Sequence, residues 1–145
     1  MAAPAKACPI LPRIRAGAAE VLAFRHPLAG LQLVKGTVEP GEAPADAAVR
    51  EMWEEAGIRV RVVRPLGTHQ ALPGQAWALF LCAIDTPLPD GWVHRTEDDG
   101  GHDFRFFWQP LTGESLAQWG PPYAAVLARI AALAAGPGWE SLTRR

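Results

Sequence analysis

The chain has 145 residues, which is enough for one domain with a core of ordinary size. Its formal net charge of −1 excludes the broad basic surface typical of proteins that bind nucleic-acid duplexes or anionic membranes. The longest apolar run, 77–84, is far shorter than the roughly 20 residues that cross a bilayer, and the N-terminus lacks the apolar segment of a signal peptide. We therefore expect a cytoplasmic protein without a membrane or duplex partner.

The first half of the chain predicts two strands, a loop and a helix. Small and apolar residues over 17–24 indicate the first strand, and the short apolar stretch 31–34 indicates the second. Two glycines and a proline make 36–41 a loop. A helix is expected over 44–56, because a proline occupies its first turn and Gly57 follows its last residue.

The second half continues with strands and closes on another helix. Strands are expected over 58–63, 77–84 and 104–108, where β-branched and aromatic residues gather. Residues 85–103 are rich in Pro, Gly, Asp and Glu and are expected to be mostly loop. Residues 121–135 carry apolar side chains at helical spacing, and a Gly-Pro pair follows them. Strands on both sides of a central helix predict an α/β fold in which helices cover a mixed sheet.

The central helix is expected to carry an apolar face and an acidic face. At about 100° per residue, Glu51, Glu54 and Glu55 come together at i, i+3 and i+4. The opposite face holds the apolar residues Val49, Met52, Trp53 and Ala56. Like charges at that spacing repel, and apart from Arg50 at the edge nothing compensates them, so a bound cation should fill the gap. Clustered carboxylate oxygens suit Mg²⁺ or Mn²⁺ far better than zinc.

The loop before the helix has the composition of a phosphate-binding segment. Gly36 and a second glycine let the backbone approach phosphate oxygens closely, and successive amides there can form an anion-binding concavity. Lys35 would add a point charge on a phosphate. A solvated lysine at the end of a strand is an equally good interpretation of Lys35, and the sequence leaves both open.

Loop and helix together form one motif, and residues 36–58 read GTVEPGEAPADAAVREMWEEAGI. Its fixed positions are Gly36, Glu42, Arg50, Glu51, Glu54, Glu55 and Gly57, with apolar Met52 and Ile58. A merely solvated acidic helix would explain three glutamates but not this complete spacing. The motif resembles the Nudix box at every defining position. Such a coincidence would arise by chance on the order of once in ten million chains of this length.

The resemblance implies a fold, a reaction and a cofactor. The fold would be a Nudix-type α/β/α sandwich, with a mixed sheet between helices and a single domain over 1–145. The reaction would be the metal-dependent hydrolysis of a diphosphate linkage in a nucleoside diphosphate derivative. Mg²⁺ or Mn²⁺ would be the cofactor and a small-molecule nucleotide the partner, and a homodimer is left open.

Residue roles follow from the same resemblance. The ligands of metal ions that bridge the diphosphate would be Glu51, Glu54, Glu55 and the carbonyl oxygen of Gly36. Arg50 would orient a glutamate by ion pairing, and Glu42 would support the loop. In physical terms, the metal would neutralise charge on the phosphates and make water a better nucleophile.

Nudix proteins often take a further acid from outside the box, as a metal ligand or as the base for the attacking water. The candidates here are Glu97, Asp98, Asp99, His102 and Asp103. We expect at least one of them to face the metal site and favour His102 and Asp103, since they adjoin a strand that can fix them. A solvated hairpin tip without a role is the alternative. The other histidines, which have no partner at a telling spacing and are expected to be structural or superficial, are His26, His69 and His94.

Two flanking features point to different substrates. Lys35-Gly36 and the segment 102–111 resemble Nudix members that act on dinucleoside polyphosphates or related polyphosphates, and we favour that class. Pro73, fifteen residues past Ile58, is placed as in the branch that hydrolyses ADP-ribose. The alternatives are an ADP-ribose or other nucleotide-sugar pyrophosphatase, a non-catalytic nucleotide-binding module, and an isomerase of isoprenoid diphosphates. The intact box argues against the last two.

Overall fold

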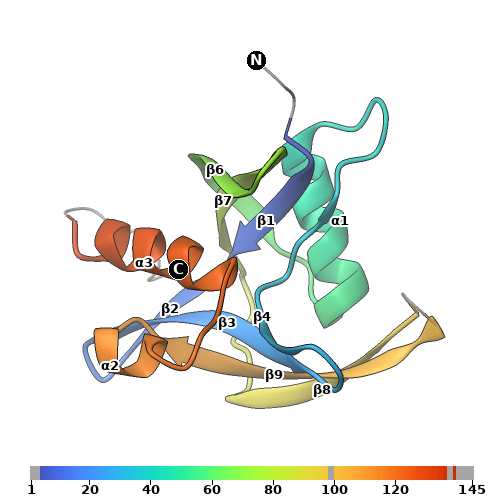
Figure 1. Ribbon diagram of the computed structural model, residues 1–145. Coiled ribbons are helices and arrows are strands. Elements are labelled where there is room, and N and C mark those ends of the chain that lie inside the picture. Colours follow the sequence, from blue (N-terminus) through green and yellow to red (C-terminus); the bar gives the residue numbers. More distant parts are fainter. Residues whose placement is uncertain (1–3, 98–99, 137–138, 140–145) are drawn as a thin grey trace.

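The computed structural model of the chain describes residues 4–97, 100–136 and 139, and it contains two sheets covered by helices (Figure 1). The strands are β1 (Lys6–Ile10), β2 (Pro12–Arg15), β3 (Ala18–His26), β4 (Gly30–Gln32), β5 (Gly36–Thr37), β6 (Arg61–Leu72), β7 (Gln75–Ala83), β8 (Gly91–Thr96) and β9 (His102–Pro110). The helices are α1 (Pro44–Ala56), α2 (Gly113–Leu116) and α3 (Tyr123–Ala134). Among the described residues, no helix is long and apolar enough to cross a membrane.

One sheet mixes parallel and antiparallel pairs, and the other is antiparallel. The first has the strand order β5-β1-β7-β6, in which β1 runs parallel to β7 and the other neighbours are antiparallel. The second has the order β2-β3-β9-β8, with β4 paired to β3. Because β1 and β2 follow one another but belong to different sheets, the chain crosses between the sheets at Leu11. The carbonyl of Leu11 accepts a hydrogen bond from the Leu22 N–H at 2.9 Å.

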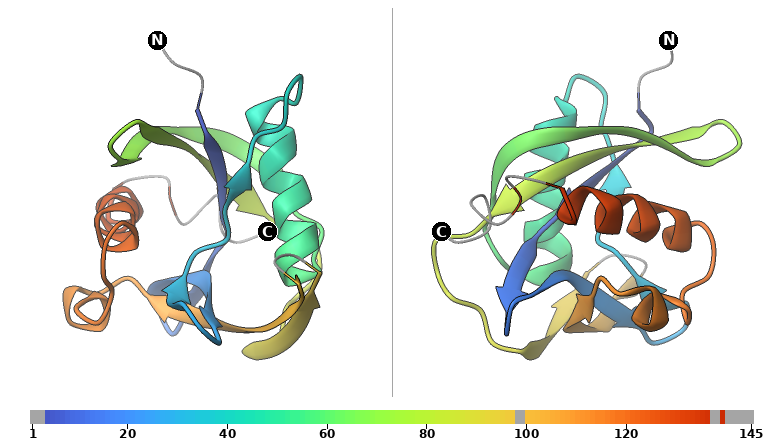
Figure 2. Two further views of the ribbon diagram at one scale, coloured as in Figure 1. Left: turned by 45° about the vertical axis from the view of Figure 1, so that its right-hand side comes forward. Right: turned by 90° about the vertical axis from the view of Figure 1, so that its left-hand side faces the viewer.

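Alternating side chains of the strands build a core on each face of the sheets. On β3, Leu22 and Phe24 pack in the core that contains α1, whereas Val21 and Ala23 pack in the core that contains α3. β1 and β7 divide in the same way, because successive strand residues point to opposite faces. The two helices therefore lie on opposite sides of the strands (Figure 2). This confirms the predicted α/β fold with sheet between helices.

The expectation that 85–103 is mostly loop is wrong for two segments. Gly91–Thr96 forms β8, and β9 begins already at His102. The two strands pair antiparallel over the whole of β8. Within β8, half-buried Trp92 and His94 alternate with exposed neighbours. This is a period-two pattern, which the polar composition of the segment obscures.

β1, β2 and α2 were not predicted, β5 lies at the start of the expected loop 36–41, and β6 is longer than expected. β1 contains Pro9, which suggests a loop, yet β1 is paired on both sides. β6 continues to Leu72 through register shifts that bracket Pro65 and Gly67. Since β6 is an edge strand, bulges there can absorb residues that would break a central strand.

Candidate active site

Helix α1 begins at Pro44 and ends before Gly57, as predicted. Ala43 at the N-cap provides no side-chain hydrogen bond, so the helix start depends on the proline in its first turn. At the other end, Gly57 adopts a φ of 74° and its N–H donates to the Trp53 carbonyl at 3.0 Å. A Cβ at Gly57 would also lie 2.6 Å from Nδ1 of His94, so conformation and space both require glycine.

The buried face of α1 differs from the predicted one. Met52 is buried as expected, but Glu51 and Glu55 are buried beside it, with only 7% and 8% of their surface exposed. Trp53, predicted on the apolar face, is 46% exposed, and the Arg59 guanidinium carbon lies 4.1 Å from its ring centroid. The helix is therefore rotated so that its inner face is shared between apolar residues and two carboxylates.

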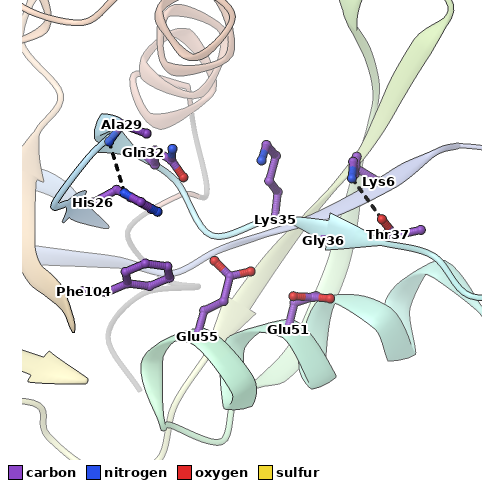
Figure 3. Close-up of a pocket in the computed structure, with 10 residues that line it drawn as sticks. All are labelled: Lys6, His26, Ala29, Gln32, Lys35, Gly36, Thr37, Glu51, Glu55 and Phe104. Atoms are coloured by element: carbon purple, nitrogen blue, oxygen red, sulfur yellow. Dashed lines mark hydrogen bonds between the residues drawn. The ribbon is translucent and has the colours of Figure 1, made fainter. Parts of the chain in front are cut away.

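Glu51 and Glu55 face a pocket of about 460 Å³, which we name the Gly36 pocket. It is lined by Lys6, His26, Ala29, Gln32, Lys35, Gly36, Thr37, Glu51, Glu55 and Phe104. The two carboxylates rise from α1 toward the segment that carries Lys35 and Gly36 (Figure 3). The glycine loop and the acidic helix, which the motif links in sequence, thus meet at one cavity.

Gly36 and Glu51 approach so closely that no side chain fits between them. A Cβ at Gly36 would overlap the carboxylate of Glu51, including both of its oxygens. The φ of Gly36 is not in the left-handed region, so space rather than backbone conformation requires glycine at this position. The loop backbone can therefore reach the carboxylate and any group bound to it.

Arg50 ties the acidic residues of the loop and the helix together. Its Nε and Nη2 donate to the two carboxylate oxygens of Glu42, each at 2.9 Å. Its Nη1 donates to Glu51 at 2.9 Å and to Glu54 at 3.1 Å. Nη2 also donates to the backbone carbonyl of Thr37 at 2.9 Å. One guanidinium thus links the loop to the helix and hydrogen-bonds the Glu51 carboxylate.

These contacts correct one premise of the sequence interpretation. The acidic face is compensated in part, because Arg50 pairs with both Glu51 and Glu54. Hydrogen bonds from Arg50 and from the Glu39 N–H lower the pKa of Glu42 to about 2. Hydrogen bonds to Glu42 and Glu51 raise the pKa of Arg50. Glu42 and Arg50 therefore remain charged and paired throughout the neutral pH range.

Two lysines line the same pocket. Lys35 is half-buried, with its Nζ 5.5 Å from the ring centroid of Trp77 and 5.7 Å from that of Tyr123. These contacts keep the ammonium group beside two aromatic rings of the core that contains α3. Lys6 lies beyond Gly36, where its Nζ donates to Oγ1 of Thr37 at 2.9 Å (Figure 3). Carboxylates and ammonium groups in one cavity suit a metal ion together with an anionic ligand.

Comparison with known proteins agrees with this arrangement. The family model described as NUDIX domain matches residues 8–130. The chain belongs to the Nudix family. It is a Nudix hydrolase, an enzyme of the class that acts on phosphorus-containing acid anhydrides.

Solved Nudix structures share the fold at low sequence identity. A C. elegans Ap4A hydrolase in a binary complex is 23% identical, with 90% of this chain and 97% of that chain covered at a TM-score of 0.62. The Nudix hydrolase RenU from M. smegmatis is 21% identical, with 91% and 86% covered at 0.61. An ADP-ribose pyrophosphatase from Streptococcus suis is 20% identical, with 94% and 96% covered at 0.58. These structural similarities establish the fold but not the substrate.

Nudix proteins typically depend on a divalent metal, and the Gly36 pocket offers part of a metal-binding shell. Within the parts of the chain that the structure describes, no three Asp, Glu, His or Cys side chains converge into a complete ligand set. Mg²⁺ is usually held by one or two carboxylates, water and substrate phosphates, so a complete protein cage is not required. Glu51, Glu55 and the backbone of Gly36 supply oxygen donors at one pocket. They fit a divalent ion shared with a bound diphosphate.

Glu54 faces a second cavity, which we name the Trp53 pocket and which also measures about 460 Å³. It is lined by Trp53, Glu54, Gly57, His94, Arg95, Thr96 and Glu97. His94 closes it against the helix, since its Nε2 lies 3.2 Å from the Glu54 carbonyl oxygen. The structure thus brings Glu51 and Glu55 together with Gly36, while Glu54 stands beside them on a different flank of α1.

Of the described candidates outside the Nudix box, only Glu97 lines one of the two pockets, and His102 lies next to a residue of the other. The ring centroid of His102 lies 4.8 Å from that of His26, a residue that lines the Gly36 pocket. Asp103 is exposed and forms an ion pair at 3.4 Å with an arginine of β8. Glu97 lines the Trp53 pocket. The remaining candidates, Asp98 and Asp99, lie outside the described residues.

Sequence reasoning missed several residues of the Gly36 pocket. Lys6 belongs to the unpredicted strand β1, and its pairing with Thr37 of β5 brings it to the site. His26 was expected to be structural or superficial, yet it lines the pocket at the end of β3. Its position before a turn was the available signal, because functional side chains gather where strands end in loops.

Proposed function

We propose that this Nudix hydrolase cleaves a diphosphate linkage in a nucleoside diphosphate derivative and prefers (di)nucleoside polyphosphates. One observation carries the proposal: Glu51 lies against the backbone of Gly36 in a pocket that Glu55 and Lys35 also line. The carboxylates match a divalent cation, and the lysine matches the phosphates that such a cation would bridge. Positioning and charge stabilisation of this kind provide most of the acceleration in phosphoryl transfer.

Each box residue then has a role. The proposed ligands of Mg²⁺ or Mn²⁺ in the Gly36 pocket are Glu51, Glu55 and the carbonyl oxygen of Gly36. For Glu54, a further ligand by the resemblance, we propose only a peripheral role, because it lines the Trp53 pocket. When bound, the ion supplies charge neutralisation on the phosphates and lowers the pKa of water. Arg50 orients Glu51 and, through Glu42, holds the loop in place. Lys35 binds a phosphate oxygen as a point charge.

For the residue outside the box that assists the attacking water, we propose His102 rather than Asp103. A base must come within hydrogen-bond reach of the water that it activates. The ring of His102 lies beside that of His26, which lines the Gly36 pocket. Asp103 is the next residue on the strand, and adjacent strand residues point to opposite faces.

The two lysines of the pocket favour a polyphosphate substrate. Lys6 and Lys35 line one cavity, so additional phosphates would meet ammonium groups rather than an apolar wall. The alternative substrate is ADP-ribose or another nucleotide sugar. Pro73, the sequence feature that supports this alternative, lies in the exposed turn between β6 and β7 and does not line the pocket.

A substrate panel tests the proposal. Diadenosine polyphosphates, nucleoside triphosphates, ADP-ribose and a nucleotide sugar would each be incubated with Mg²⁺ and with Mn²⁺, and the products separated by chromatography. We expect the highest kcat/KM for the polyphosphates. The reverse order would favour the nucleotide-sugar alternative. Binding without any product, under both metals, would indicate a non-catalytic nucleotide-binding module.

A further inference from the structure

His26 ends strand β3, and its ring is held by the turn that follows. The loop from Pro27 to Ala29 connects β3 to β4, and Gly30 closes the turn with a φ of 82°. The backbone N–H groups of Leu28 and Ala29 donate to Nδ1 of His26 at 3.0 and 3.1 Å. Pro27 has no N–H to donate, and the next two amides of the loop both donate to the same ring nitrogen.

These two hydrogen bonds fix the tautomer of His26. A ring nitrogen that accepts from backbone N–H groups must offer its lone pair, so Nδ1 carries no proton. In a neutral imidazole the proton then resides on Nε2, which becomes a hydrogen-bond donor. The turn therefore makes His26 a donor at Nε2 and prevents it from acting as a base there.

The Nε2 side of the ring faces the Gly36 pocket. In Figure 3, Nδ1 is engaged by the turn at Ala29 while the rest of the ring projects into the cavity above Phe104. The Phe104 ring centroid lies 5.2 Å away, and that of His102 lies 4.8 Å away. Aromatic packing on one side and the turn on the other limit the orientations open to the imidazole.

We propose that His26 is a substrate-binding residue, which donates Nε2–H to a phosphate oxygen of the bound diphosphate derivative. This inference rests on the proposed function and adds a residue that the Nudix box does not contain. A neutral donor complements Lys35 in the same pocket, because it binds an anionic oxygen without adding a further positive charge beside the metal site.

The tautomer is tested by nitrogen NMR of the histidine side chains at neutral pH. We expect Nδ1 of His26 to show the chemical shift of an unprotonated ring nitrogen and Nε2 that of a protonated one. Saturation with α,β-methylene-ADP and Mg²⁺, which cannot be cleaved between its phosphates, should then shift the Nε2–H resonance. A protonated Nδ1, or an Nε2 signal that does not change at saturation, would overturn the inference.

Two substitutions of His26 test separately its role as acceptor for the turn amides and its role as hydrogen-bond donor to the substrate. In His26→Asn, the side-chain oxygen can still accept from the turn amides, as asparagine does in Asx turns, but the Nε2 donor is lost. We expect an unchanged melting temperature, a raised KM and a kcat/KM about 10- to 100-fold lower. In His26→Gln, an amide N–H can still reach the substrate while the turn loses its acceptor. We expect a lower melting temperature and a smaller loss of kcat/KM.

The control is His69→Asn on β6, a histidine that does not line the pocket. It should keep the parent KM and kcat. A folded His26→Asn enzyme with the parent KM would refute the role of His26, even if hydrolysis itself is confirmed. Conversely, a parent chain that hydrolyses nothing would refute the proposed function, while the NMR response to α,β-methylene-ADP would still decide whether His26 contacts a diphosphate.

Discussion

The two flanks of α1 carry cavities of equal size and different chemistry. Both the Gly36 pocket and the Trp53 pocket measure about 460 Å³. The first combines buried Glu51 and Glu55 with a close backbone approach at Gly36. The second presents a half-exposed indole, Trp53, and the more exposed carboxylate of Glu54. Volume alone therefore does not identify the site.

The difference shows what a catalytic pocket requires of one helix. We propose that carboxylates which share a metal ion with a diphosphate must line one pocket and have a backbone oxygen near them. The i, i+4 pair Glu51 and Glu55 meets that condition, whereas Glu54 is turned away by the helical repeat. Arg50 contacts Glu51 and Glu54 alike and so couples the two flanks.

The largest expected effect comes from neutralising the pocket carboxylates. Glu51→Gln and Glu55→Gln, each made singly, should lower kcat by at least about a hundredfold, near 2.7 kcal/mol of transition-state stabilisation, with the fold intact. Steady-state kinetics under saturating Mg²⁺ measures this, with circular dichroism to confirm folding. Glu114→Gln on exposed α2 is the control and should keep the parent rate. If a pocket variant retains most of the parent activity, the substituted carboxylate is not a ligand of the metal.

The next effect comes from filling the contact between loop and helix. In Gly36→Ala, the new methyl group would displace the Glu51 carboxylate. We expect a loss of about 1–3 kcal/mol in the free energy of unfolding and a fall in kcat of up to about a hundredfold. Gly113→Ala is a matched control, because a Cβ there meets nothing within 4 Å and its φ is unstrained. Equal behaviour of the two variants would contradict the close packing of Gly36.

A smaller effect is expected on the other flank. Glu54→Gln removes an i, i+4 ion pair with Arg50 and a charge near the Trp53 pocket. We expect kcat to fall by less than about tenfold, which corresponds to under about 1.4 kcal/mol. If Glu54→Gln is as damaging as Glu55→Gln under the same conditions, the two flanks act as one metal site, and the distinction between the pockets fails for Glu54.

The smallest effect concerns the pH dependence of the melting temperature. The folded pKa of Glu42 is lowered from 4.5 to about 2. The pair with Arg50 therefore stabilises the fold above pH 4.5, and this contribution is lost as the pH falls through about 2. Glu42→Gln should lower the melting temperature at neutral pH, and the difference from the parent should shrink between these two values. A difference that stays constant over this range would show that the Glu42 pair makes no pH-dependent contribution.

The sequence predicted most of the site because its spacing is local. The helix start, its end at Gly57 and the meeting of Gly36 with the acidic helix all follow from residues 36–58. Helical periodicity shows which residues of α1 share a face, but it does not show which face packs against the sheets. The rotation of α1 about its axis could therefore not be predicted. Trp53 was therefore placed inside and Glu51 outside, the reverse of the structure.

Residues brought by strand pairing were harder to predict. Lys6 reaches the pocket only because β1 pairs with β5, a contact that local sequence does not encode. β8 was hidden by its polar composition, although Trp92 and His94 alternate as strand residues do. His26 has no motif at all, and its role depends on the turn amides that fix its ring.

The most direct test of the central claim is to determine which of the two pockets binds the metal ion. Mn²⁺ broadens the NMR signals of nearby nuclei, so titration of the ¹⁵N-labelled protein reports which residues surround it. We predict that the amide signals of Gly36, Thr37 and Glu55 broaden at the lowest Mn²⁺ concentrations. The amide signals of Arg95 and Glu97 should broaden only at higher Mn²⁺ concentrations. Broadening that begins in the Trp53 pocket, or none at millimolar Mn²⁺, would contradict the assignment of the Gly36 pocket as the catalytic centre.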